Sequence, residues 1–145
     1  MYKTILVAVD GSQGSQKALE HASGLQQLTD AELQILTVFR HHSLLEGSMS
    51  MVRPTEPENL DNVMRDHAKD VAEEAKSLAA SAGATKVRAF VKAGQPARTI
   101  VKFGEEHGAD LIVVGSRGLG DLEGFLLGSV SHKVTSLARC AVLVV

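Results

Sequence analysis

A cluster of glycines and serines late in the chain has the residue types and the spacing of an anion-binding loop. Three glycines and a serine follow the pattern G, two residues, G, nine residues, G-S, at Gly115, Gly118, Gly128 and Ser129. Glycines let backbone N–H groups approach an anion closely, and a helix after the loop adds unpaired N–H groups and the positive end of its dipole. Arg117 supplies a positive charge, and Ser129 and Ser131 supply hydroxyl groups. The pattern predicts a cradle for phosphate groups.

Two further candidate positions follow segments that we expect to be strands. Asp10 follows the first apolar run of the chain, and residues 94–96, Gly-Gln-Pro, follow the third. A carboxylate at the end of a strand suits the hydroxyls of a ribose, so we interpret Asp10 as a ligand-binding residue. The alternative interpretation is that Asp10 caps the following helix, a role that Ser12 fills equally well.

The sequence predicts neither a metal site nor a catalytic residue. His41 and His42 are adjacent, but no cysteine or second histidine cluster stands at zinc-like spacing. The chain also lacks the GK[ST] of a P-loop, the GxGxxG and GxSxG patterns, and the HxGH signature of nucleotidyl transferases. We expect Cys140 to be a small core residue, because free cysteine is among the most buried residue types.

Predicted strands and helices, which alternate along the chain, must position these candidate residues. Continuous apolar runs rich in β-branched residues predict buried strands at residues 2–10, 33–39, 86–91, 110–114 and 141–145. Apolar residues that recur every three or four positions predict helices from Ser12 to about Asp30 and over residues 60–82, 96–107 and 129–138. Pro96 suits the first turn of its helix, and Gly83 suits the position after a helix end.

This order of elements predicts an α/β fold with a parallel sheet, right-handed crossovers and helices on both faces. At 145 residues the chain has the length of one domain, which we expect to cover residues 1–145. Ligands of such sheets bind at the carboxyl ends of the strands. Asp10, residues 94–96 and Gly115 all follow strands, so we expect them at one edge of the sheet.

Composition and charge exclude several classes of protein. The chain has 15 Lys and Arg residues against 17 Asp and Glu residues, so it lacks the basic field that binds nucleic acid. No apolar run approaches the ~20 residues that cross a bilayer, so we expect no insertion into a membrane. The first residues do not form a signal-peptide pattern and the chain has one cysteine, which together predict a cytoplasmic protein.

Residues 40–59 interrupt the periodicity with Gly47, Pro54 and Pro57. This segment is longer than most connections in a compact domain. Three interpretations stay open for it: a lid over the ligand, an interface with a partner, or a disordered segment.

Together these features resemble the universal stress protein family, in particular its ATP-binding subtype. The motifs ILVAVDGS, GQPARTI, DLIVVGSRG, LLGSVS and CAVLVV extend the resemblance over nearly the whole chain. It implies a Rossmann-like sheet of five strands in the order 3-2-1-4-5. The residues that it implies for ATP are Ala8, Asp10, Val38, Gly115, Arg117, Gly118, Gly128, Ser129, Val130 and Ser131. Adenine is implied near Asp10 and the backbone of Val38, ribose near Asp10 and Gly115, and the phosphates along the glycine-rich loop.

Two positions depart from the family's pattern. Ala141 stands where the family very often has proline, and Gln95 replaces an acidic or small residue beside Pro96. Neither position belongs to the phosphate loop, so the expected binding site is unchanged.

The resemblance implies a regulator that holds ATP in the stress response and controls a partner or its own assembly. No general base is expected near the phosphates, so the alternative, a slow ATP-hydrolysing or nucleotide-transferring enzyme, is disfavoured. Whether Mg²⁺ accompanies the phosphates stays open. The chain is also similar to the family member associated with an ectoine TRAP transporter, which implies a membrane transporter for osmolytes as the partner.

The last predicted strand, residues 141–145, is an apolar edge with no later element to cover it. Such an edge exposes unpaired N–H and C=O groups unless another strand pairs with it. A homodimer joined through Ala141 to Val145 would pair this edge, and the resemblance implies the same arrangement. A tetramer stays open.

Overall fold

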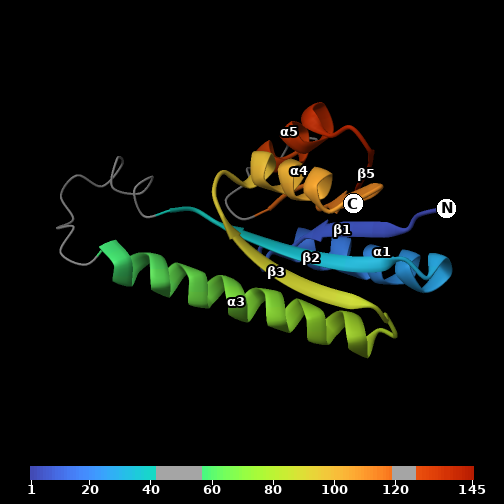
Figure 1. Cartoon of the computed structure of the whole chain (residues 1–145), viewed down its shortest axis with the longest axis horizontal. Helices are drawn as coiled ribbons and strands as arrows, with labels where there is room; N and C mark the ends of the chain where they lie inside the picture. The colour runs from blue at the N-terminus through green and yellow to red at the C-terminus, as the bar shows by residue number, and fades with distance from the viewer. Residues whose placement is uncertain (42–56, 119–126) are drawn as a thin grey trace.

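The computed structural model describes residues 1–41, 57–118 and 127–145, which form a parallel β-sheet between two layers of helices (Figure 1). The strands are β1 (Thr4–Ala8), β2 (Glu32–Phe39), β3 (Val87–Ala93), β4 (Leu111–Val114) and β5 (Ala141–Val144). The helices of the described ranges are α1 (Gln13–Thr29), α3 (Pro57–Ser81), α4 (Pro96–Glu106) and α5 (Ser129–Leu137). The strand order is β3-β2-β1-β4-β5 and every pair is parallel, which confirms the predicted fold class and strand order.

Both faces of the sheet are covered, which explains why its strands are apolar at nearly every position. One face packs on α1 and α3 through a core that includes Ile5 and Val113. The other face packs on α4 and α5 through a core that includes Leu6 and Ile112. Because successive side chains of a strand point to opposite faces, each strand contributes to both cores.

Some boundaries differ from those that periodicity predicts. β1 ends at Ala8, although the Val9 N–H still donates to Leu36 O at 2.9 Å, and the Asp10 N–H then donates to Ser15 Oγ at 3.3 Å. β3 continues to Ala93, which pairs with Phe39. α3 begins at Pro57, inside the segment predicted as a loop, and residues 42–56 of that segment lie outside the described residues. In the ranges that the structure covers, no helix has the length and apolarity needed to cross a membrane.

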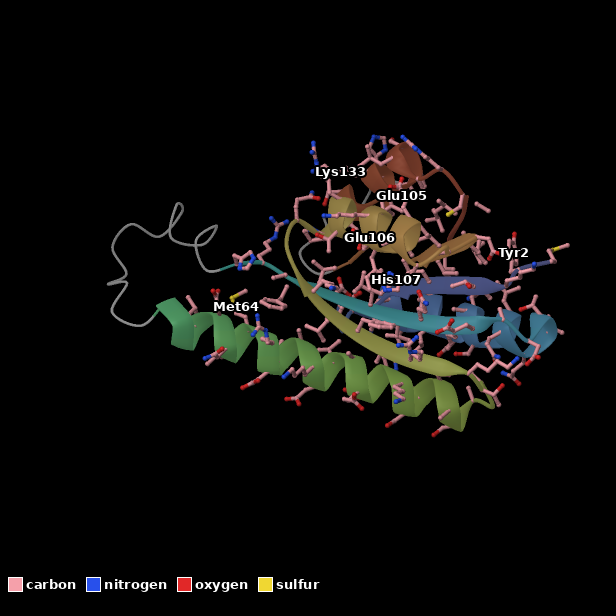
Figure 2. The ribbon with its side chains drawn as sticks, in the orientation of Figure 1. Tyr2, Met64, Glu105, Glu106, His107 and Lys133 are labelled. Atoms are coloured by element: carbon pink, nitrogen blue, oxygen red, sulfur yellow. The ribbon has the colours of Figure 1, made fainter. Side chains whose placement is uncertain are left out.

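Aromatic rings fix the C-terminal end of α4 against the sheet. The ring centroids of Phe103 and Phe90 lie 5.0 Å apart, and His107 stacks on Phe103 at 3.8 Å. Figure 2 shows His107 with Glu105 and Glu106 at this end of α4. Because α4 is fixed there, its other end at Pro96 is held at the carboxyl edge of the sheet.

Thr37 of β2 provides a test of core energetics. Its side chain is 4% exposed, and its hydroxyl oxygen has no hydrogen-bond partner among the described residues. Burying an unpaired hydroxyl costs free energy, and valine has the same shape without the polar atom. We therefore expect Thr37→Val to raise the free energy of unfolding by about 1 kcal/mol, as measured by urea denaturation.

Ser23→Ala is the matched control for this prediction. Ser23 is equally buried, but its hydroxyl donates to the Leu19 carbonyl oxygen at 2.8 Å. Removing this satisfied hydroxyl should give no gain in stability. A Thr37→Val variant that unfolds at a lower urea concentration than the wild type would contradict the interpretation.

Candidate functional site

A cavity of about 270 Å³ opens at the carboxyl edge of the sheet, where β1, β2 and β4 end and α1, α4 and α5 begin. Most residues implied for ATP line it: Ala8, Asp10, Val38, Gly115, Arg117, Gly118, Ser129, Val130 and Ser131. Gly128 is buried beside it as the N-cap of α5. Asp10, Pro96 and Gly115 meet at this cavity, as expected for residues that follow parallel strands. Their roles toward a ligand stay predictions.

The cavity has an apolar end and a polar end. On the side of β1, β2 and α4 the apolar lining residues are Ala8, Leu36, Val38, Pro96 and Ile100, and Val9, Val114 and Val130 complete the apolar lining. The loop after β4 and the first turn of α5 contribute polar groups at Gly115, Arg117, Gly118, Ser129 and Ser131, and the other polar lining residues are Asp10, Ser12, Ser15 and Arg40. Most small-molecule sites combine apolar walls with a few placed polar groups, and this division suits a ligand with a flat apolar part and an anionic part.

The first turn of α5 presents its backbone N–H groups at the polar end. The first helical hydrogen bond of α5 runs from the His132 N–H to the Gly128 carbonyl oxygen, so Ser129, Val130 and Ser131 have no helical acceptor for their N–H groups. Gly128 brings no side-chain cap to compete for them. All three residues line the cavity. This helix end therefore offers an anion both N–H donors and the positive end of the dipole.

The hydroxyl of Ser131 has a different role from the one expected. Ser131 is 2% exposed, and its Oγ lies 2.9 Å from Ser116 O and 3.1 Å from Gly128 O, so its one proton is shared between these two carbonyl oxygens. The hydroxyl proton therefore stabilises the loop. Ser129 is exposed at the same helix end, so its hydroxyl is the one that can reach a ligand.

Ser116 connects the two ends of this loop to the rest of the sheet. Its N–H donates to Val145 O at 2.6 Å, and its carbonyl oxygen accepts from the Gly128 N–H at 2.5 Å. The Val145 N–H in turn donates to Val114 O at 2.9 Å. The polar end of the cavity is thus anchored to both β4 and β5.

Gly115 lies against the backbone of α1 with no space for a side chain. A Cβ atom at Gly115 would lie 2.6 Å from the carbonyl carbon and 2.7 Å from the carbonyl oxygen of Gly14. A Cβ atom at Gly14 would in turn overlap the carbonyl oxygen of Arg117. The two glycines allow the first turn of α1 and the loop after β4 to meet directly.

Hydrogen bonds around Asp10 decide which residue caps α1. Ser12 is the N-cap, and its Oγ accepts from the Ser15 N–H at 3.2 Å. Asp10 Oδ1 instead accepts from the Ser12 N–H at 2.9 Å, which orients the carboxylate at the mouth of the cavity. Of the two capping interpretations, the one with Ser12 is confirmed.

The backbone of Val38 faces the crevice beyond the end of β1. In a parallel ladder the residues of a strand bond alternately to one neighbour and the other. The Leu33 N–H donates to Lys86 and the Phe39 carbonyl oxygen accepts from Gly94, which flank β3, whereas the Leu36 carbonyl oxygen accepts from Val9 on the β1 side. Val38 therefore faces the β1 side as well, and β1 ends at Ala8. The backbone N–H and C=O of Val38 therefore point toward a group bound at the apolar end of the cavity.

Several residues of the cavity were missed by sequence reasoning. They are Val9, Ser12, Ser15, Leu36, Arg40, Ile100 and Val114. The signal for Leu36 and Arg40 was the alternation of strand side chains, because both stand two positions from Val38. Gly14 left no signal, since its contact with Arg117 joins segments far apart in the chain.

Comparison with known proteins places the chain in a family. The universal stress protein family matches residues 1–145. The chain belongs to this family. Universal stress protein YxiE of Bacillus subtilis is 38% identical, with 100% of this chain and 99% of YxiE covered.

Solved structures of universal stress proteins and their relatives share the fold. The structure of hypothetical protein MJ0577 is 32% identical, with a TM-score of 0.84, and the match covers 100% of this chain and 96% of that one. A universal stress protein in complex with cAMP is 30% identical, with a TM-score of 0.72 and coverage of 99% and 96%. The membership in the family therefore rests on sequence and structure together.

Other reactive side chains lie away from the cavity. Within residues 1–41, 57–118 and 127–145, no three His, Cys, Asp or Glu side chains are grouped as metal ligands would be. Cys140 is half-buried and packs against the core between the sheet and the helices α4 and α5. Burial raises the pKa of its thiol, and the charges of Asp110 and Glu105 add to the effect. The thiol is therefore held in its less reactive, protonated form at neutral pH.

Proposed function

We propose that this universal stress protein binds ATP in the cavity at the carboxyl edge of the sheet and acts as a nucleotide-controlled regulator. The observation that carries the proposal is the first turn of α5, where three cavity-lining residues have no helical acceptor for their N–H groups and lie beside a glycine-rich loop. The phosphates would bind there, with Arg117 and the Ser129 hydroxyl as additional donors.

The rest of the nucleotide fits the order of elements around the cavity. The adenine would lie at the apolar end, where the backbone N–H and C=O of Val38 can bind its edge. The ribose would lie between, near Asp10 and Gly115, because a carboxylate can accept hydrogen bonds from its hydroxyls. The solved complex of a related universal stress protein with cAMP supports an adenine nucleotide as the ligand.

A holding role is favoured over catalysis because of where the carboxylate lies. In the cavity lining, Asp10 follows β1 on the ribose side, while the phosphate donors come from the loop after β4. A general base must reach the attacking water beside the γ-phosphate. We therefore propose ATP hydrolysis that is slow at most, with Mg²⁺ held through the phosphates if it is bound.

The proposed assembly is a homodimer through β5. This strand is an edge of the sheet, and Val142, Leu143 and Val144 are only half-buried in one copy. Pairing of two such edges would satisfy their outward N–H and C=O groups. A tetramer built from such dimers remains the larger alternative.

The finer proposals follow from the family resemblance. The regulated partner would be a membrane transporter for osmolytes, the location would be the ATP-rich cytoplasm, and residues 1–145 would act as one domain. Capture of partner proteins on the immobilised chain, with and without ATP, tests the first of these. Recovery of a transporter subunit that depends on ATP would support it, and its absence from both samples would contradict it.

The binding proposal is tested by isothermal titration with ATP and by mass analysis of nucleotide that purifies with the protein. We expect a one-to-one complex that is retained for minutes with little ADP. Ser129→Ala, which removes the hydroxyl but keeps the N–H, should weaken binding by about tenfold. No binding at millimolar ATP would overturn the proposal. Multiple turnovers that are lost in Asp10→Ala would favour the enzyme instead.

A further inference from the structure

We propose that Arg40 is a positioning residue that lies over the base of the bound nucleotide and slows its release. The inference rests on the proposed nucleotide site, and it assigns a role to a side chain that neither the glycine pattern nor the family resemblance singled out. Three observations carry it: the direction of the side chain, the end of the cavity at which it lies, and the absence of partners for its guanidinium among the described residues.

The direction follows from the alternation of β2 and the residues after it. Leu36, Val38 and Arg40 share one face, and all three line the cavity. The intervening residues turn the other way. Phe39 and His41 contact each other at a ring distance of 6.4 Å, and His41 Nδ1 lies 3.9 Å from Asp61 of α3. Arg40 is thereby directed at the cavity and away from α3.

The end of the cavity follows from the strand order. β2 and β4 lie on opposite sides of β1, so they are separated by two strand spacings, about 10 Å. The phosphate donors follow β4, whereas Arg40 follows β2. A nucleotide whose phosphates bind at α5 would span this distance and place its base beside Val38. Arg40 then meets the base and not the phosphates.

The guanidinium is available for such a contact. Arg40 is exposed and makes no ion pair or hydrogen bond with the residues that the structure describes. By contrast, Arg88 lies 3.3 Å from Glu32 and Arg139 lies 3.8 Å from Glu105. A planar, weakly hydrated guanidinium stacks on aromatic rings. At the apolar end of the cavity that ring would be the purine base of the proposed nucleotide. Stacking would leave the guanidinium N–H groups in water.

The test compares adenosine, AMP and ATP as ligands of the wild type, Arg40→Ala and Arg40→Lys, by isothermal titration and stopped-flow release. Stacking predicts that Arg40→Ala weakens all three ligands by the same factor, roughly tenfold, mainly through faster release. Arg40→Lys keeps the charge but loses the plane, so it should resemble the alanine variant. The loss should change little with salt, because no phosphate contact is removed.

Two other results would overturn the inference. If Arg40 contacted phosphate, the loss would be large for ATP, absent for adenosine, and largely restored by lysine. If Arg40 only sat in solvent, all variants would bind like the wild type. Arg98→Ala is the matched control, because Arg98 is an exposed arginine of α4 outside the cavity, and it should bind like the wild type. A wild type that binds none of the three ligands would instead defeat the proposed function.

Discussion

Replacing Gly115 with alanine is expected to lower the affinity for ATP by about 100-fold. The added methyl group would lie 2.6 to 2.7 Å from backbone atoms of Gly14, and backbone cannot move aside as a flexible side chain can. The loop after β4 must therefore shift relative to the first turn of α5. Losing two charge-assisted hydrogen bonds to phosphate costs about 3 kcal/mol, which corresponds to the expected factor. Isothermal titration measures it.

Gly24→Ala is the matched control, because the same change is made where, apart from the backbone of its own helix and its chain neighbours, no described atom lies within 4 Å of the new methyl group. Gly24 is inside α1, so alanine should leave ATP binding unchanged and raise the free energy of unfolding by about 0.5 to 1 kcal/mol. Thermal melting of both variants separates a displaced loop from general unfolding. A folded Gly115→Ala protein with wild-type affinity would contradict the proposed position of the phosphates.

The second large effect is expected from Val144→Pro, which should convert the proposed homodimer into a folded monomer. The Val145 N–H donates to Val114 of β4, and in a parallel ladder the neighbouring residue points the other way. The N–H of Val144 therefore faces the open edge of β5. Proline removes this donor and places its ring there, which edge strands tolerate but a paired strand does not.

Sedimentation equilibrium should show the dimer dissociation constant raised by roughly 100-fold, because both copies lose the donor. Val144→Thr keeps the N–H and a side chain of similar shape, so it should remain dimeric. Circular dichroism checks that the proline variant is folded. A folded Val144→Pro protein that stays dimeric would place the interface elsewhere.

Periodicity predicted the strands and helices because each apolar run is covered on both faces of the sheet. It did not predict that β1 stops at Ala8 or that the Asp10 N–H donates to Ser15 Oγ, because side-chain contacts of this kind leave no apolar pattern. The strand order came from the family resemblance and not from periodicity, since an alternation of strands and helices is compatible with several orders. Pairing between segments that are distant in the chain leaves no local pattern in the sequence, so only the structure shows it.

In the candidate site, too, the sequence predicted local features but not contacts between distant segments. The glycine spacing predicted the loop and the N–H donors of α5, because both are local features of the sequence. It also suggested a phosphate-binding hydroxyl at Ser131, whereas the structure directs that hydroxyl to the Ser116 carbonyl oxygen. Arg40 and Gly14 were missed because their importance arises from the sheet order and from a contact between the first turn of α1 and the loop after β4.

Ser116 binds Val145 with its N–H and the start of α5 with its carbonyl oxygen, so one residue touches both the proposed dimer edge and the phosphate loop. Ser116 gives the two binding equilibria a shared structural element, and any coupling between two binding equilibria is reciprocal. If ATP strengthens dimerisation by some factor, dimerisation must strengthen ATP binding by the same factor. The measured affinity for ATP would then rise with protein concentration, and the protein would respond to its own abundance as well as to the nucleotide.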